Sequence, residues 1–155
     1  LIDRFIKSLN ISKEDGLLLV GHGGLGSGNS SYGNLQFKLI RDGLTNVRVA
    51  VLENAPYVAD VAMPWEWLDG KRPNTIYVHP LLLVLGDHAQ NDLFGDEEDS
   101  VINELADYGY EVKPIHSALG EYEAIQDIFR QHVQDCIDDL YGKRSTHRPT
   151  IPNIK

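Results

Sequence analysis

Apolar and polar positions along this chain follow two spacings, one typical of buried strands and one typical of helices. Two runs, 17–20 and 81–85, are apolar throughout, too short for a surface helix and too continuous for a half-exposed strand. Such runs are typical of strands buried on both faces of a parallel sheet. The pattern predicts strands at residues 17–20, 47–52, 75–85 and 111–115. Helical spacing predicts helices at residues 2–9, 30–42, 56–67, 101–108 and 122–141.

Strands and helices therefore alternate along the 155 residues. The alternation calls for right-handed crossovers and predicts an α/β fold, with a single four-stranded parallel sheet and helices on both faces. Residues 1–155 are expected to form one domain of flavodoxin- or Rossmann-like topology, with an N-terminal helix and linker at 1–15 and a loose tail at 142–155. A strand order of 2-1-3-4 would place the topological switch point between the first and third strands.

Some expectations concern single elements. Pro80 inside the third strand indicates a bulge or a late strand start, and Pro64 is expected to kink or break its helix. The acidic segment 87–99 is predicted to be a loop. The last helix is strongly amphipathic, and its apolar side is expected to be buried, with Cys136 as a core residue. That side comprises Ile125, Ile128, Phe129, Val133, Cys136, Ile137 and Leu140.

Composition and charge narrow the class of protein. A hydrophobic fraction of 42% and a charged fraction of 24% are those of a soluble globular protein, and no apolar run is long enough to cross a bilayer. The net charge of −9 argues against nucleic acid as a partner. The single cysteine rules out an internal disulfide, and we expect a cytoplasmic protein, with the periplasm as the alternative. Because the chain begins at Leu1 and its one methionine is Met63, a processed product, a trimmed chain or a fragment is expected.

Three side chains of metal-binding types follow three of the predicted strands. His22 follows the first strand, Glu53 the second, and His88 the third, directly after Asp87. The carboxyl ends of parallel strands meet at one edge of the sheet, where ligands bind. Each residue alone is more simply a structural or solvated side chain. Together they form a donor set suited to cobalt, iron, nickel or zinc.

The glycine-rich segment 21–28 also invites a nucleotide-binding interpretation. It lacks the lysine of a phosphate loop, and its glycine spacing only loosely matches a dinucleotide fingerprint. His22 stands where the backbone should approach a pyrophosphate without a side chain, although Glu53 does occupy the position of a ribose-binding acid. We therefore expect no nucleotide and keep the oxidoreductase interpretation as a minor alternative.

Other chemically active side chains have simpler explanations. His79 is expected to be packed or hydrogen-bonded inside a strand, and His132 to be solvated on the last helix. His116 begins a segment, 116–121, that would line the same crevice as His22, and it is a weaker candidate. Trp65 and Trp67 are expected to pack in the core or at its rim rather than to cover a flat ligand.

Three sequence blocks carry a resemblance to a known family. They are Leu-Val-Gly-His-Gly at 19–23, Pro-Leu-Leu-Leu-Val-Leu-Gly-Asp-His-Ala-Gln-Asn-Asp at 80–92 and Leu-Gly-Glu at 119–121, followed by Ala-Ile-Gln-Asp-Ile-Phe at 124–129. They resemble the anaerobic cobalt chelatases, the class II sirohydrochlorin cobaltochelatases of cobalamin biosynthesis. The likeness runs from about Gly16 to Ile137 and is to the carboxyl-terminal lobe of the long, two-lobed form.

The resemblance implies a lyase that inserts a divalent metal into the tetrapyrrole sirohydrochlorin without ATP. The metal would be Co(II), with Fe(II) or Ni(II) as alternatives, held by His22, Glu53 and His88, and the same three residues would be catalytic. Gly23, Gly24 and Asn29 are expected to bind the macrocycle through the glycine loop and the helix start that follows it.

Two departures from the long form matter. Many long-form members carry a threonine and a further histidine after Gly-His-Gly, where this chain has Gly24, Leu25 and Gly26. The long form also has a second lobe, so we expect either a homodimer or a missing N-terminal lobe. The alternatives to catalysis are a non-catalytic tetrapyrrole- or metal-binding module and a half-domain without independent function.

Overall fold

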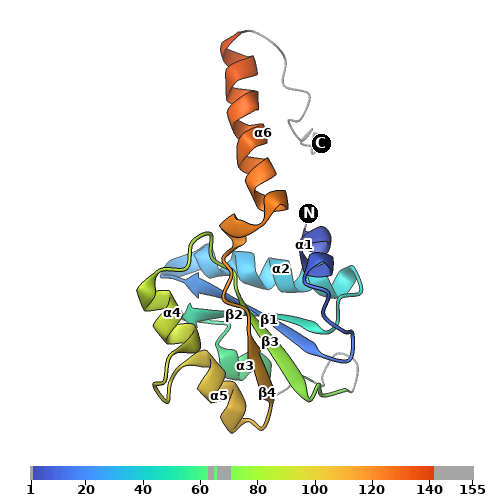
Figure 1. Cartoon of the computed structure of the whole chain (residues 1–155), viewed down its shortest axis with the longest axis vertical. Helices are drawn as coiled ribbons and strands as arrows, with labels where there is room; N and C mark the ends of the chain where they lie inside the picture. The colour runs from blue at the N-terminus through green and yellow to red at the C-terminus, as the bar shows by residue number, and fades with distance from the viewer. Residues whose placement is uncertain (1, 63–64, 66–70, 142–155) are drawn as a thin grey trace.

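The computed structural model of the chain describes residues 2–62, 65 and 71–141. Its centre is a four-stranded parallel sheet in the order β2-β1-β3-β4, which confirms the predicted strand order (Figure 1). The strands are β1 (Gly16–Gly23), β2 (Val47–Glu53), β3 (Thr75–Pro80) and β4 (Glu111–Pro114).

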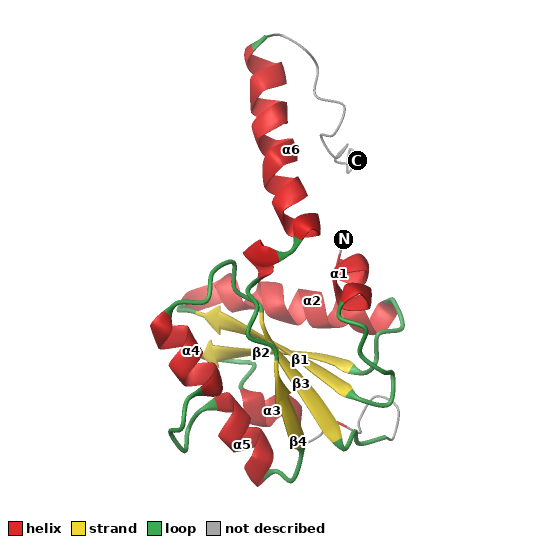
Figure 2. Ribbon diagram, viewed as in Figure 1, coloured by secondary structure: helices red, strands yellow, loops and turns green. Residues whose placement is uncertain are grey.

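Helices cover both faces of the sheet, as the alternating pattern predicted (Figure 2). The described helices are α1 (Ile2–Ser8), α2 (Ser30–Arg41), α3 (Val58–Ala62), α4 (Asp87–Phe94), α5 (Val101–Asp107) and α6 (Glu123–Leu140). Two short 3-10 helices lie at Gly26–Asn29 and Leu119–Glu121. α1 and α2 lie on one face, and α3 and α5 lie on the other.

The core divides into two clusters because successive side chains of a strand point to opposite faces. Leu18 and Val20 of β1 pack with α3, α4 and α5, whereas Leu17 and Leu19 pack with α1 and α2. All four side chains are fully buried. The sheet is therefore covered on both sides, as continuous apolar strands require.

α1 contributes more to the core than the N-terminal helix and linker predicted for 1–15. Phe5 and Ile6 are buried against β1 and β2. The Phe5 ring meets the rings of His79 and Tyr122 edge-on, each at a centroid distance of 5.0 Å. α1 therefore seals the sheet face over β1 and β3.

His79 is a fully buried histidine of β3, as predicted. Its Nδ1 lies 2.7 Å from the carbonyl oxygen of Pro80, and its Nε2 lies 2.9 Å from the hydroxyl of Tyr122. Because the carbonyl can only accept, the neutral ring donates from Nδ1 and accepts the Tyr122 O–H at Nε2. This bond ties the segment before α6 to the middle of the sheet.

Two strand boundaries differ from prediction. β1 continues through residues 21–23, so His22 is the second-last residue of the strand rather than a residue that follows it. β3 stops at Pro80, and residues 81–86 form an irregular segment instead of a buried strand. β4 ends at Pro114, so residues beyond Pro80 have no partner strand on that side, and on the β1 side the Leu81 N–H still donates to the carbonyl oxygen of Val20 at 2.6 Å. The carbonyl groups of Leu82 and Leu83 instead accept hydrogen bonds from the backbone of residues 119 and 120.

Two helix predictions also need correction. The first half of the predicted acidic loop at 87–99 is α4, because Leu93 is fully buried in the core and stabilises a helix there. Within the predicted irregular helix at 56–67, the described residues include the short α3 at Val58–Ala62, and Pro64 lies outside the described residues.

The largest difference from prediction is the position of α6. The helix forms where expected, but it projects away from the body of the domain instead of packing on it (Figure 1). The side predicted to be buried, which we call the apolar stripe, contains no buried residue, and Cys136 is exposed. The stripe consists of Ile125, Ile128, Phe129, Val133, Cys136, Ile137 and Leu140. The hydrophobic periodicity predicted the amphipathic helix correctly, but the prediction that its apolar side packs in the core of this domain is wrong.

The ends of β1 and β2 are held together at a glycine. Gly23 pairs with Glu53 in the parallel register and has a φ of 81°. A Cβ atom at Gly23 would lie 2.1 Å from the carbonyl oxygen of Glu53. Only glycine therefore fits between the two strand ends.

We predict that Gly23→Ala lowers the free energy of unfolding by at least about 2 kcal/mol, since the substitution combines a backbone clash with an unfavourable φ. Gly24→Ala is the matched control, because a Cβ there has no atom within 4 Å. It should change stability by less than about 0.5 kcal/mol in urea unfolding. Equal stability of the two variants would contradict the assigned geometry.

A second prediction concerns pH. Burial lowers the pKa of His79, so the native ring stays neutral while the unfolded chain binds a proton below about pH 6.5. Because the unfolded state then binds more protons, stability should fall by about 1–2 kcal/mol between pH 7 and pH 5. In urea unfolding at the two pH values, His79→Phe should reduce this loss of stability, and His132→Ala should leave it unchanged. An equal loss of stability in His79→Phe would show that His79 does not cause the pH dependence.

Candidate functional site

His22 and Glu53 lie side by side at the carboxyl edge of the sheet. Nδ1 of His22 is 4.0 Å from Oε2 of Glu53, and the two side chains are 52% and 56% exposed. The same ring nitrogen lies 3.3 Å from the carbonyl oxygen of Gly23. The pair is too exposed to stabilise the fold appreciably by charge attraction.

This spacing is close to that of two ligands on one cation. Metal bonds to imidazole nitrogen and carboxylate oxygen are each about 2.1 Å long, so neighbouring donor atoms on one ion lie about 3.0–3.4 Å apart and opposite ones about 4.2 Å apart. From 4.0 Å, a small side-chain rotation would bring His22 and Glu53 to the shorter spacing. Both side chains are open to solvent, which leaves room for a further ligand.

The third predicted ligand, His88, has its backbone in the first turn of α4. Its side chain lies outside the described residues. Among the side chains that are described, no group of three histidine, cysteine, aspartate or glutamate residues is close enough to hold a metal. The structure thus brings two members of the predicted trio together, and the trio as a metal site stays a prediction.

Two asparagines brace the His22–Glu53 pair. Nδ2 of Asn29 donates to the carbonyl oxygens of Glu53 and Ala55, at 3.0 and 3.1 Å. Nδ2 of Asn54 donates to the carbonyl oxygen of Gly24 at 2.9 Å. These bonds join the loop after β1 to the loop after β2 from both sides. Asn54 was missed by the sequence analysis, although its φ of 66° is one that asparagine tolerates better than most residues.

A hollow of about 390 Å³ opens at the same edge of the sheet. Its walls come from the segment after β3, from α4 and from the segment after β4. They comprise Leu83, Val84, Leu85, Gln90, His116, Ala118, Gly120 and Glu121. Four residues of the segment 116–121 thus line this hollow, whereas His22 and Glu53 are not among its lining residues, so a crevice shared with His22 stays a prediction. The walls are largely apolar, and Val84 is 75% exposed, which suits an apolar, flat ligand better than a phosphate.

The remaining residues considered in the sequence analysis lie in simple structural surroundings. His132 is exposed on α6, and the ring of His116 meets Phe94 at a centroid distance of 4.5 Å. Trp65 is buried, with Arg48 5.0 Å from its ring centre, and Trp67 lies outside the described residues.

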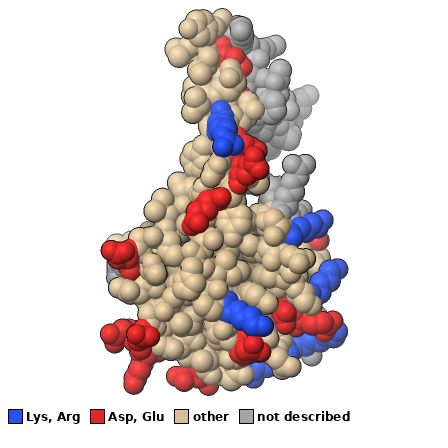
Figure 3. Space-filling model, in the orientation of Figure 1, with Lys and Arg blue, Asp and Glu red and all other residues tan. Residues whose placement is uncertain are grey.

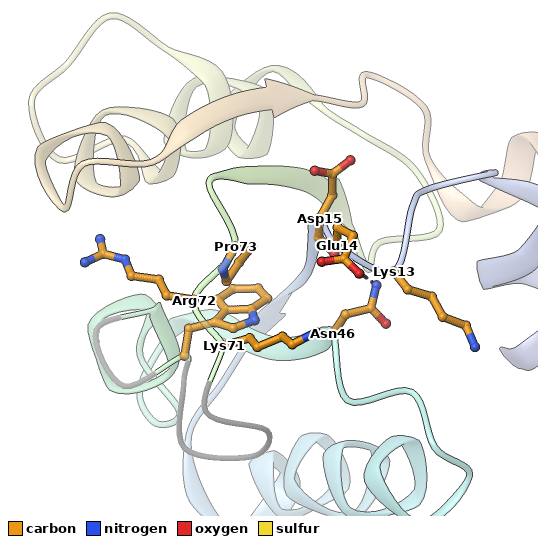
Figure 4. A pocket seen from close by; sticks show the side chains of 8 residues that line it. Lys13, Glu14, Asp15, Asn46, Lys71, Arg72 and Pro73 are labelled. Carbon is orange, nitrogen blue, oxygen red and sulfur yellow. Dashed lines mark hydrogen bonds between the residues drawn. The ribbon is translucent and has the colours of Figure 1, made fainter.

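A second pocket, of about 230 Å³, lies at the opposite, amino-terminal edge of the sheet (Figure 4). Its lining includes Lys13, Asp15 and Asn46, close to the starts of β1 and β2. Ligands of parallel sheets bind beyond the carboxyl ends of the strands. The edge that carries His22 is therefore the candidate site.

No helix within residues 2–62, 65 and 71–141 is both long enough and apolar enough to span a membrane.

Comparisons with known proteins find relatives that match most of this chain. A family model described as cobalt chelatase (CbiK) matches residues 1–138. The sirohydrochlorin cobaltochelatase of Salmonella typhimurium is 27% identical over 129 residues, which is 83% of this chain and 47% of the relative. This chain thus spans about half the length of that curated relative.

A solved structure shares the fold. It is that of a protein from Marinobacter aquaeolei VT8 described as a CbiX protein of cobalamin (vitamin B12) biosynthesis. The TM-score is 0.62 at 16% identity, and the alignment covers 82% of this chain and 98% of the other. At this identity the likeness concerns the fold alone, a parallel four-stranded α/β sheet. The match of the family model over most of the sequence shows more: the chain belongs to the cobalt chelatase (CbiK) family.

Proposed function

We propose that this chain inserts a divalent metal, Co(II) in the first instance, into sirohydrochlorin without ATP. The observation that carries the proposal is the 4.0 Å approach of His22 to Glu53 at the carboxyl edge of the sheet. Family membership supports the reaction class, since the relative from Salmonella is a sirohydrochlorin cobaltochelatase. Fe(II) and Ni(II) are the alternative metal substrates.

In this proposal the metal substrate binds first, to His22, Glu53 and His88. Imidazole and carboxylate donors suit cobalt, iron and nickel, and the open side of the pair leaves coordination positions for the macrocycle nitrogens. Asn29 acts as a positioning residue, because its side chain nitrogen already donates to two carbonyl groups of the loop that follows β2.

The macrocycle would lie against the apolar walls of the hollow at this edge. Leu83 and Val84 offer an exposed apolar surface to a flat ring. Backbone N–H groups of the glycine loop at Gly23 and Gly24 would meet the carboxylates at the rim of the macrocycle, a mode of anion binding that requires no net positive charge.

The reaction must release two protons. Each pyrrole N–H that is replaced by the metal gives up one proton, and the metal brings two positive charges, so charge balances without a nucleotide or a redox partner. Neutral imidazole is a suitable acceptor near neutral pH. A ring nitrogen that holds the metal has no lone pair for a proton, so each histidine would become an acceptor as the metal passes to the macrocycle nitrogens. We assign His22 as the first acceptor and His88 as the second.

We expect insertion, followed by the absorbance change of sirohydrochlorin with Co(II), to fall by at least about 100-fold in His22→Ala and in His88→Ala. His132→Ala is the control, because this exposed histidine lies on α6. Full activity in both alanine variants would end the catalytic assignment.

Metal binding can be tested without the macrocycle. Co(II) affinity, measured by titration calorimetry, should fall by about 10- to 100-fold in His22→Ala and in Glu53→Gln. Co(II) affinity that both substitutions leave unchanged would contradict ligation by this pair.

A second candidate function is a binding module that holds metal or tetrapyrrole without turnover. The observation in its favour is that this chain spans 47% of the relative, while His22 and Glu53 are both more than half exposed. Co(II) and sirohydrochlorin binding without insertion by the unsubstituted chain would select this function.

A further inference from the structure

The hollow at the carboxyl edge of the sheet combines an apolar wall with two polar side chains that can donate hydrogen bonds. His116 and Gln90 line it together with apolar residues such as Val84. Both polar side chains are exposed, and neither makes a hydrogen bond to any residue that the structure describes. In ligand sites, a few polar groups in an apolar wall fix the orientation of the ligand. The hollow therefore suits a ligand with an apolar body and a polar substituent.

The ring of His116 is supported by α4. It meets the ring of Phe94 at a centroid distance of 4.5 Å and an interplanar angle of 60°. Phe94 is partly buried and packs against the core, so the imidazole rests on a fixed surface. Gln90 lies one helical turn before Phe94 in the same helix. The two side chains thus reach the hollow from neighbouring elements, the segment after β4 and α4.

The strand register places this hollow beside the proposed metal site. The pairing of β1 with β3 and of β3 with β4 puts His116 level with Pro80, and His22 two residues further along β1. Two strand spacings across the sheet and two residue rises along it separate the Cα atoms of His22 and His116 by about 12 Å. Gln90 follows His88 by two residues in α4. The hollow is therefore next to the metal site without coinciding with it.

Charge leaves hydrogen-bond donors as the means of holding an anion here. Among the described residues that line the hollow there is no lysine or arginine. Figure 3 shows the described surface between α4 and the base of α6 without a basic side chain. Glu121 is the charged residue among those that line the hollow, and its Oε1 accepts a hydrogen bond from the Ala118 N–H at 2.7 Å. The imidazole of His116 and the amide of Gln90 carry the N–H groups that an anion would meet.

We infer that His116 and Gln90 form a subsite for one rim carboxylate of the macrocycle. The inference rests on the proposed function, because it takes a tetrapyrrole carboxylate as the ligand. The apolar body of the ring covers Leu83 and Val84, and the carboxylate accepts hydrogen bonds from the two N–H groups. The glycine loop after β1 receives a carboxylate of another edge. The macrocycle is then held at two sides, which orients its central nitrogens toward the metal between them.

This subsite determines specificity as well as orientation. A hydrogen bond to an ionised carboxylate is stronger than one to a neutral group, so the pair favours a macrocycle with anionic substituents. A tetrapyrrole whose carboxylates are methyl esters gains only the contacts with the apolar wall and weak neutral hydrogen bonds. His116 therefore selects the carboxylated substrate class.

The test is the affinity for metal-free sirohydrochlorin, measured by fluorescence titration of the 155-residue chain at constant pH. His116→Phe keeps a ring against Phe94 and removes the N–H, so the affinity should fall by about tenfold. His116→Gln returns an N–H donor and should bind within about threefold of the unsubstituted chain. His132→Phe makes the same substitution at an exposed position of α6 and should change nothing.

Glu121 provides a test with the opposite sign. Glu121→Gln removes a negative charge from the hollow and keeps an oxygen that can accept the Ala118 N–H bond. The affinity for the carboxylated macrocycle should therefore rise by about two- to fivefold. A structural role of these residues alone would not improve binding. With the methyl-esterified macrocycle, the unsubstituted chain, His116→Phe and Glu121→Gln should bind with affinities within about twofold of one another.

Three results would overturn the inference. They are equal affinity of the unsubstituted chain and His116→Phe for sirohydrochlorin, an affinity of His116→Gln as low as that of His116→Phe, and an affinity that Glu121→Gln does not raise. Absence of sirohydrochlorin binding to the unsubstituted chain would overturn it as well.

The same variants separate this inference from the proposed function. Binding of the metal-free macrocycle requires no insertion, so a chain that binds without turnover would end the proposed catalysis and leave the subsite testable. Where insertion is observed, His116→Phe should raise KM by about tenfold and leave kcat unchanged, because the carboxylate contact is the same before and during insertion. A lower kcat with an unchanged KM would contradict a role in binding.

Discussion

The close packing of Gly23 against the end of β2 is the constraint on which the candidate site depends. His22 and Glu53 stand on different strands, 31 positions apart in the chain, and their side chains meet only because the two strand ends are in register. The register is held by a glycine that leaves no space for a side chain. Asn29 and Asn54 then fasten the loops that leave the two strands. The half-exposed His22–Glu53 pair is thus carried by a hydrogen-bonded backbone, which would hold the two side chains in place for the proposed metal binding.

The two faces of the sheet are completed in different ways. On one face, α3, α4 and α5 follow the usual course of a parallel α/β lobe. On the other face, α1 supplies the apolar side chains that close the sheet, and α6 leaves. Because α1 covers this face, α6 has no place on it, and the apolar side of α6 contains no buried residue.

Much of the fold could be predicted from the sequence because its strands are buried on both faces. Continuous apolar runs and their alternation with helices identified the sheet, its order and the edge at which His22 and Glu53 meet. The pattern failed where apolar residues serve something other than this domain's own core. Leu83 and Val84 look like a strand and are an exposed wall of the hollow, and the α6 stripe looks like core and is uncovered.

The remaining misses have local causes. The start of the acidic segment was predicted to be a loop because its charges outnumber its apolar residues, yet one buried side chain, Leu93, is enough to hold α4 in place. The bracing roles of Asn29 and Asn54 depend on backbone carbonyl positions, which no residue pattern encodes. The predicted contribution of His88 depends on a side chain that the structure does not describe.

One small feature links the hollow to α6. The backbone N–H groups of Leu119 and Gly120 donate to the carbonyls of Leu82 and Leu83 at 2.8 and 3.0 Å, and a Cβ at Gly120 would lie 2.7 Å from the second of these carbonyls. The stretch that forms one wall of the hollow is thus clamped to the stretch from which α6 rises. Displacing the base of α6 would therefore strain the backbone hydrogen bonds that shape this side of the hollow.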